Sequence, residues 1–145
     1  MIHQNRVRGK EMRGLLIALT VPVWLSSAPV ALAREMPPTE TKGVSVDSQV
    51  MLNLATQLPE LRGYALRIRK ITFEPGAVLA HHSLAERPTA AYVISGEFTD
   101  VRDGGQAVVR GPGDHWVEGA DYKHWGANRG QVPTVVIAVD IVPKK

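Results

Sequence analysis

The feature that most constrains this chain is a series of short strand-forming runs between glycine- and proline-rich breaks, which begins at residue 64. In the first run polar and apolar residues alternate, as in a strand with one face in water. The runs cover residues 64–73, 90–99, 107–109, 115–117 and 134–142. The breaks lie at residues 74–76, 87–88, 103–105, 111–113 and 130–133. Many short strands with regular turns and no long helical pattern predict a β-sandwich or barrel.

Composition narrows the class of protein further. The chain has 145 residues, of which 44% are apolar and 21% charged, and it contains no cysteine. This length suits one domain, and the apolar share is enough to fill one core. The composition excludes collagen-like, coiled-coil and strongly charged disordered chains. The lack of cysteine excludes disulfide scaffolds, thiol catalysis and thiolate zinc sites.

Residues 1–33 have the three parts of a secretory signal peptide. Four basic side chains precede an apolar run over residues 15–25, and Ala31-Leu32-Ala33 ends the segment. We therefore predict a signal helix that is cleaved after Ala33, and a periplasmic or secreted protein. The alternative is an uncleaved anchor, because residues 14–33 are long enough to cross a bilayer. Two prolines and the small residues at the end favour cleavage, so we expect membrane contact only through the signal peptide.

The basic character of the chain belongs to that segment. The formal net charge is +3 and the sequence pI is about 9.4, values that would suggest a nucleic-acid partner. Four of the 17 basic and one of the 14 acidic residues lie in residues 1–33, which leaves 13 of each sign in residues 34–145. The remaining chain has a formal net charge of zero, and we expect no nucleic acid among its partners.

The chain after the signal divides at residue 64. Residues 34–63 are a leader and an irregular segment, beginning with a proline-rich polar stretch. Within them, residues 44–61 could form either an edge strand or a helical turn, because their periodicity fits both. We place the barrel domain at residues 64–145 and expect six to eight antiparallel strands in it.

Histidines are the residues best placed to carry chemistry in this domain. His81 and His82 follow a Pro-Gly turn, and His124 lies in a second turn-rich segment. Two strands could therefore bring them together inside a small barrel. Nucleophilic catalysis has little support, because the sequence has no cysteine and no GxSxG motif.

Two stretches around these histidines resemble the motifs of the cupin family. The first family motif, G(x)5HxH(x)3-4E(x)6G, matches the spacing of residues 76–96, which contain His82. The second, G(x)5PxG(x)2H(x)3N, aligns with residues 113–128, which contain His124. The resemblance extends over residues 66–142. It implies an all-β antiparallel barrel, the double-stranded β-helix or jelly roll of the cupins.

The resemblance also implies a metal site, which is incomplete in this chain. In metal-binding cupins, three histidines and a glutamate hold a divalent ion such as iron, manganese, zinc, nickel or copper. His82 and His124 stand at two of those positions, but Leu84 and Thr89 stand at the other two. Leucine has no lone pair to donate and threonine is a poor neutral ligand. His82 and His124 are therefore the predicted ligands of a degenerate site.

A third metal ligand could come from a neighbouring residue, and we include His115 for that role. His81 and His82 are adjacent on a strand and point to opposite faces, so His82 would take the inward one. His115 and Glu118 are three residues apart, so at most one of them faces inward on a regular strand. The nearby carboxylates are those of Glu86, Glu118 and Asp121.

Three functions are compatible with these residues. The first is an exported barrel that binds a small molecule, a divalent metal or both, without a defined turnover. The second is a metal-dependent dioxygenase or isomerase that acts on a small organic substrate. The third is a structural or partner-binding barrel in which the histidines are incidental. A fold does not fix a function, so whether the protein is an enzyme stays open.

Three further expectations concern residues outside this site. The run Arg67, Arg69 and Lys70 should form a solvated face of its strand. Asn128 should bond local backbone at a turn rather than a ligand. The apolar strand over residues 135–139 could supply an exposed edge through which the protein forms a homodimer.

Overall fold

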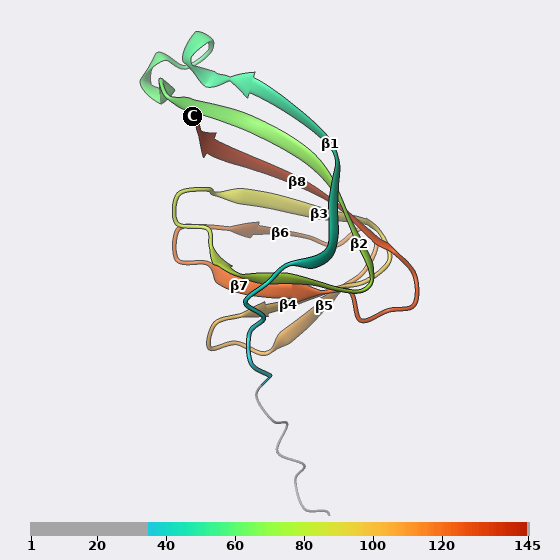
Figure 1. Ribbon diagram of the computed structural model, residues 1–145. Coiled ribbons are helices and arrows are strands. Elements are labelled where there is room, and N and C mark those ends of the chain that lie inside the picture. The colour runs from blue at the N-terminus through green and yellow to red at the C-terminus, as the bar shows by residue number, and fades with distance from the viewer. Residues whose placement is uncertain (1–34, 145) are drawn as a thin grey trace, which may run out of the picture. The chain divides into compact units, whose positions relative to one another are not determined.

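The structure is a computed structural model that describes residues 35–144, and in that part it is an all-β barrel (Figure 1). The predicted signal peptide and its cleavage site lie outside the described residues, so both stay predictions. Within residues 35–144, no helix has the length and hydropathy to span a membrane. The strands are β1 (Lys42–Asn53), β2 (Tyr64–Ser83), β3 (Thr89–Ser95), β4 (Phe98–Arg102), β5 (Ala107–Arg110), β6 (His115–Glu118), β7 (Lys123–Ala127) and β8 (Thr134–Pro143).

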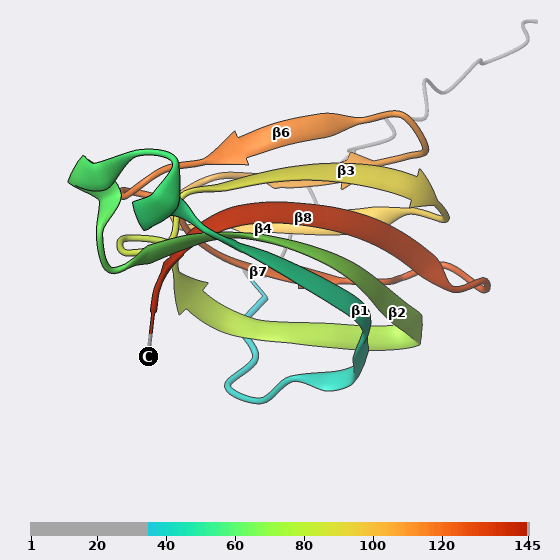
Figure 2. The ribbon, with the colours of Figure 1, turned by 90° about the horizontal axis from the view of Figure 1, so that it is seen from above.

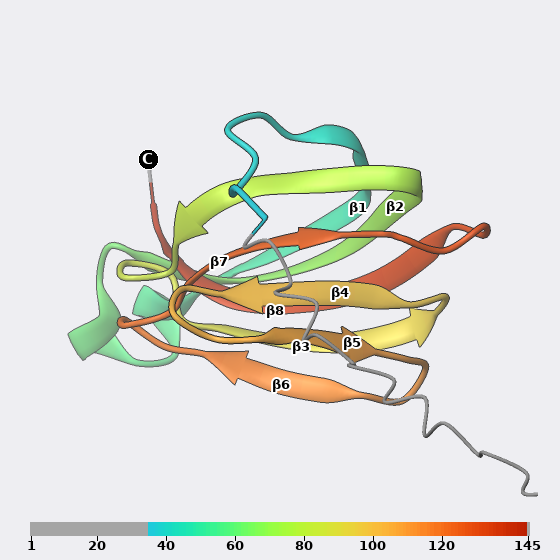
Figure 3. The same ribbon diagram turned by 90° about the horizontal axis from the view of Figure 1, so that it is seen from below.

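Two groups of strands face each other across the interior (Figures 2 and 3). One group has the order β1-β2-β8-β3-β6, and the other has the order β2-β7-β4-β5. Every pairing is antiparallel. The eight strands of the described part confirm the prediction of a cupin-like jelly roll with six to eight antiparallel strands.

Strand β2 is shared by both groups because it bends in the middle. Its first half pairs with β8 from Tyr64 to Phe73, and its second half pairs with β7 from Val78 to Ser83. Gly76 lies between the halves with a φ of 78°, a conformation that glycine adopts without steric cost. The predicted break at residues 74–76 is therefore a bend within one long strand.

The segment expected to be irregular contains a strand. β1 runs antiparallel to the first half of β2, and two 3-10 turns follow it, η1 (Leu54–Thr56) and η2 (Pro59–Leu61). Residues 44–61 thus contain both of the alternatives left open by their periodicity. The pairing places Val44 and Val46 of β1 on the wall of the barrel interior.

The interior is filled from alternating positions of the strands. On β8 the buried side chains are those of every second residue, including Val136 and Ala138. The Phe73 and Phe98 rings lie 5.0 Å apart between centroids and join the two groups of strands. The buried core cluster consists of Phe73, Ala77, Ala91, Val93, Phe98 and Val136.

Asn128 closes the end of the barrel at the bend of β2. Its side-chain amide donates to the backbone carbonyls of Phe73 and Val132, at 2.9 and 2.8 Å. Its side-chain oxygen accepts from the Gly130 backbone N–H at 2.9 Å. The expectation that Asn128 bonds local backbone is confirmed, and the bond to Phe73 also ties β2 to the loop before β8.

Strand β8 does not offer the exposed edge that the sequence suggested. It pairs with β2 along one side and with β3 along the other. The expectation that residues 135–139 supply a free edge is therefore wrong, because both edges are used inside the barrel.

Gly126 on β7 provides a test of the packing between the two groups of strands. A Cβ atom at this position would overlap the ring of Phe98. We expect Gly126→Ala to lower the free energy of unfolding by about 1–3 kcal/mol, the usual cost of overpacking. Gly111→Ala is the matched control, because nothing lies within 4 Å of its Cβ position. Equal midpoints of urea unfolding for the two variants would contradict this packing.

Candidate functional site

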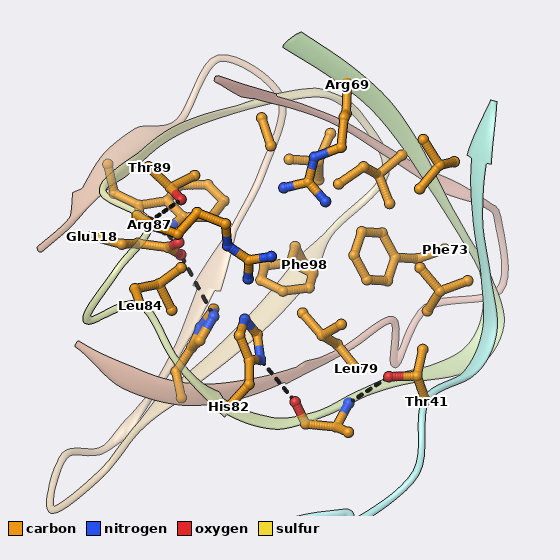
Figure 4. Close-up of a pocket in the computed structure, with 18 residues that line it drawn as sticks. Thr41, Arg69, Phe73, Leu79, His82, Leu84, Arg87, Thr89, Phe98 and Glu118 are labelled. Carbon is orange, nitrogen blue, oxygen red and sulfur yellow. Dashed lines mark hydrogen bonds and ion pairs between the residues drawn. The ribbon is translucent and has the colours of Figure 1, made fainter. Parts of the chain in front are cut away.

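A cavity of about 410 Å³ lies inside the barrel, between the two groups of strands (Figure 4). One part of its wall is apolar and contains Phe73, Phe98 and Leu79. Another part carries polar side chains from β2, β3, β6, β7 and the loop between β2 and β3. These polar side chains are Arg69, His82, Arg87, Thr89, Glu118 and His124.

His82 and His124 lie side by side in this cavity, as the sequence suggested. They are partners across β2 and β7, with ring centroids 4.7 Å apart. The Nδ1 atom of His82 is 2.9 Å from the Ala80 carbonyl oxygen, so Nδ1 donates and Nε2 is left for other contacts. His81 points away, with Nε2 2.8 Å from a carboxylate oxygen of Asp103. The expected opposite orientation of the two neighbours is thus observed.

Burial sets the protonation behaviour of His82. Desolvation lowers the pKa of its imidazole below the usual value. The positive charge of nearby Arg87 lowers the pKa further, while the bond to the Ala80 carbonyl acts in the opposite direction. His82 is therefore biased toward the neutral form near pH 7.

Asp100 on β4 holds His124 in place. One carboxylate oxygen is 2.7 Å from His124 Nδ1, and the other accepts from the Tyr122 hydroxyl at 2.7 Å. Arg110 also donates to this second oxygen, at 3.1 Å. A buried carboxylate with three donors is fully used as an acceptor, and it fixes the orientation of the His124 ring.

The same contacts shift the pKa values of Asp100 and Tyr122. Burial acts to raise the pKa of Asp100, but the bonds from His124 and Tyr122 outweigh it, so the net pKa is lowered. Burial and the hydrogen bond to Asp100 raise the pKa of Tyr122 to about 12. Asp100 is therefore a charged acceptor and Tyr122 a neutral donor throughout the physiological range of pH.

β6 turns Glu118 inward and His115 outward. Glu118 is buried, accepts from the Trp116 indole at 2.7 Å, and lies 3.7 Å from His124 Nε2. His115 is exposed and stacks on Tyr92 with ring centroids 6.5 Å apart, on the outer face of the barrel. The structure therefore does not bring His115 together with His82 and His124. The inward residue of the pair is Glu118.

The expectation of a solvated face is wrong for Arg67 and Arg69, whereas Lys70 is exposed. Arg67 makes two hydrogen bonds to Asp140, at 2.9 and 2.7 Å, and Arg69 makes one at 2.8 Å. Both side chains are largely buried, because the antiparallel register puts Arg67 directly opposite Asp140 on β8. The one available signal was an acidic residue in the otherwise apolar run TVVIAVDIV.

The donors in the cavity do not form a metal site of the family type. Leu84 and Thr89, which replace two family ligands, both line the cavity and supply no strong donor. Among residues 35–144, no three His, Asp or Glu side chains converge closely enough to hold an ion. The residues present therefore do not fit a tightly held resident metal.

The family follows from a match over the part of the chain that builds this cavity. Residues 69–140 match the family model described as a cupin domain. This chain is a cupin. The match begins at Arg69 and ends at Asp140, so it includes both cavity histidines and the Arg69–Asp140 pair.

Solved structures similar to this cupin share its fold. An RmlC-like cupin from Shewanella frigidimarina has 22% sequence identity and a TM-score of 0.51, covering 74% of this chain and 86% of its own. Ectoine synthase from P. lautus has 17% identity and a TM-score of 0.53, covering 72% and 67%. A predicted oxalate decarboxylase from Thermotoga maritima has 18% identity and a TM-score of 0.50, covering 73% and 93%. A search of curated proteins gave no match.

Glu118 gives this cupin a measurable pH dependence. Burial raises its pKa above the usual 4.5 of a glutamate, so the folded state binds the proton more tightly than the unfolded state. The free energy of unfolding contributed by Glu118 therefore falls as pH rises from 4.5 through the folded pKa. We expect Glu118→Gln, which keeps an oxygen for Trp116, to become more stable relative to wild type over this range.

Urea unfolding from about pH 4 to about pH 8 measures this difference, with Glu86→Gln as the exposed control. A constant difference between Glu118→Gln and wild type over the whole range would contradict the raised pKa.

Proposed function

We propose that this cupin is an exported, non-catalytic protein that binds a small organic molecule in its barrel. The observation that carries the proposal is the 410 Å³ cavity, which joins a mostly apolar wall to a few convergent polar groups. Binding sites for small molecules have this size and composition. The proposed export rests on the signal peptide, and an N-terminus at Arg34 in the mature protein, read by mass spectrometry, would test it.

The proposal needs no metal ion. Two imidazoles alone hold a divalent ion weakly, and the other two family positions carry Leu84 and Thr89. His124 Nδ1 is bound to Asp100, so only Nε2 is left to bind a ligand, and Glu118 Oε1 accepts from Trp116. A metal-dependent dioxygenase or isomerase would need at least one further donor in the cavity, which argues for binding over turnover.

The solved relatives support the general class of ligand and no more. Ectoine synthase and the predicted oxalate decarboxylase are named for small organic compounds. At under 25% identity they share a fold with this chain, and a fold does not carry a substrate with it. The size and lining of the cavity are therefore the stronger support.

Filling the cavity tests this function. Ala138 on β8 is buried and lines the cavity. We expect Ala138→Phe to lower the affinity for cavity ligands about tenfold or more, because the added ring occupies their space. The measurement is a screen of small organic fragments by NMR chemical shift, with Ala107→Phe on exposed β5 as the control.

Two outcomes of this screen would contradict the proposal. One is that no fragment shifts the resonances of His82 or His124. The other is that binding requires an added divalent ion and disappears with a chelator, which would favour the metal-dependent alternative.

An apolar row on the outer face of the barrel favours a second copy of this chain as a partner. A row of five side chains that are paired across β1, β2, β8, β3 and β6 is entirely apolar. The row consists of Val50, Ile68, Val139, Ala90 and Val117. At a strand spacing of ~4.8 Å and about four outward positions per strand, this face measures roughly 600 Å². That area approaches the roughly 800 Å² per partner of a stable interface.

We therefore propose that the homodimer suggested by the sequence forms through this outer face. Val117 lies at the β6 end of this row, and a lysine there would be buried against the second copy without a counter-ion, so we expect Val117→Lys to give a monomer. Val109→Lys on β5 should leave the dimer intact, since Val109 is also exposed but lies on another strand group. Light scattering at micromolar concentration measures the mass. A monomeric wild type would exclude the dimer.

A further inference from the structure

Two arginines from different elements meet at the polar end of the cavity. Arg69 comes from β2, and Arg87 comes from the loop between β2 and β3. Figure 4 shows both guanidinium groups directed toward the middle of the cavity. Two planar donor groups that converge from different segments form a fork for a planar acceptor.

One carboxylate serves three arginines at this end. Asp140 is fully buried, and its Oδ2 atom accepts from Arg67 at 2.7 Å and from Arg69 at 2.8 Å. Arg87 Nε lies 3.8 Å from the same oxygen, beyond hydrogen-bond distance. The cluster therefore carries a formal excess of two positive charges, which a buried site can hold only with nearby negative charge.

Donors remain unused after these contacts. The Nε atoms of Arg69 and Arg87 are buried and lack a hydrogen-bond partner among residues 35–144. Buried donors in folded proteins nearly always have an acceptor. An acceptor in the cavity would remove this deficit and part of the charge excess together.

Glu118 does not supply the missing negative charge in full. One negative charge on Glu118 would still leave one positive charge in excess, and no hydrogen bond joins its carboxylate, which accepts from Trp116 at 2.7 Å, to Arg87 in the described part of the chain. The arginines at the cavity therefore keep an excess of positive charge that no carboxylate of the described residues neutralises.

The apolar part of the cavity lining decides what the rest of a ligand looks like. It contains Phe73, Phe98, Leu79 and Ile71, so no charged group meets a ligand there. A ligand that satisfies both ends has one anionic head and an apolar body.

We propose that the cavity binds a small organic carboxylate, with its carboxylate against Arg69 and Arg87 and its apolar body against Phe73 and Phe98. This inference rests on the proposed function, since it assigns the ligand class of the same cavity. Inorganic phosphate shares the negative charge but lacks the body, so it should bind more weakly than the carboxylate.

Phenylacetate and its uncharged amide, phenylacetamide, are matched probes for this site. We expect the purified wild-type protein to bind phenylacetate about tenfold more tightly than phenylacetamide, measured by calorimetry. Arg87→Gln should remove most of this preference, because it lowers the affinity for the acid much more than the affinity for the amide. Arg62→Gln, an exposed arginine outside the cavity, should leave both affinities unchanged.

The remaining outcomes distinguish a failure of the carboxylate inference from a failure of the proposed function. If wild type binds acid and amide equally and Ala138→Phe abolishes both, the carboxylate inference fails and the proposed function stands. If inorganic phosphate binds as tightly as phenylacetate, the site is a general anion site and the inference also fails. If neither probe binds while other fragments do, the inference alone fails. If no fragment binds, both fail. Arg69→Gln repeats the test should Arg87→Gln not fold.

Discussion

The bend in β2 is the constraint on which the rest of the structure depends. One strand pairs with β8 and β1 before Gly76 and with β7 after it, so the two groups of strands are joined by continuous backbone. The same strand therefore carries Arg69 at one side of the cavity and His82 at the other. A side chain on Cβ at Gly76 would strain the positive φ that makes this turn of the strand possible.

Two buried carboxylates, Asp100 and Asp140, each accept hydrogen bonds from more than one polar side chain. Asp100 has its oxygens filled by His124, Tyr122 and Arg110, so that region is complete and rigid. Asp140 faces more positive charge than it can neutralise, so that region is incomplete. The contrast explains why the His124 ring is held in one orientation, while Arg69 and Arg87 each have an Nε donor without a partner among residues 35–144. The ligand site that we propose therefore centres on the arginines at Asp140 and not on the positions of the family's metal ligands.

Much of the fold could be predicted from local pattern. Short alternating runs and Gly-Pro breaks predicted the antiparallel barrel, and the spacing of the two motifs predicted that His82 and His124 would meet. Other features depend on partners distant in sequence. Arg67 looked solvated because its counter-ion, Asp140, is 73 residues away. The edges of β8 looked free because nothing local shows that β2 and β3 take both of them.

Residue type and spacing were enough to predict the strands after residue 64, the family and the loss of two metal-ligand positions, because none of these depends on contacts between distant residues. Only the tertiary structure decided which face each side chain of β6 takes, and with it that Glu118 rather than His115 reaches the cavity. It also decided that three arginines share one buried aspartate. The physical reason is that burial and charge pairing are set by contacts between strands, and those contacts arise only when the barrel closes.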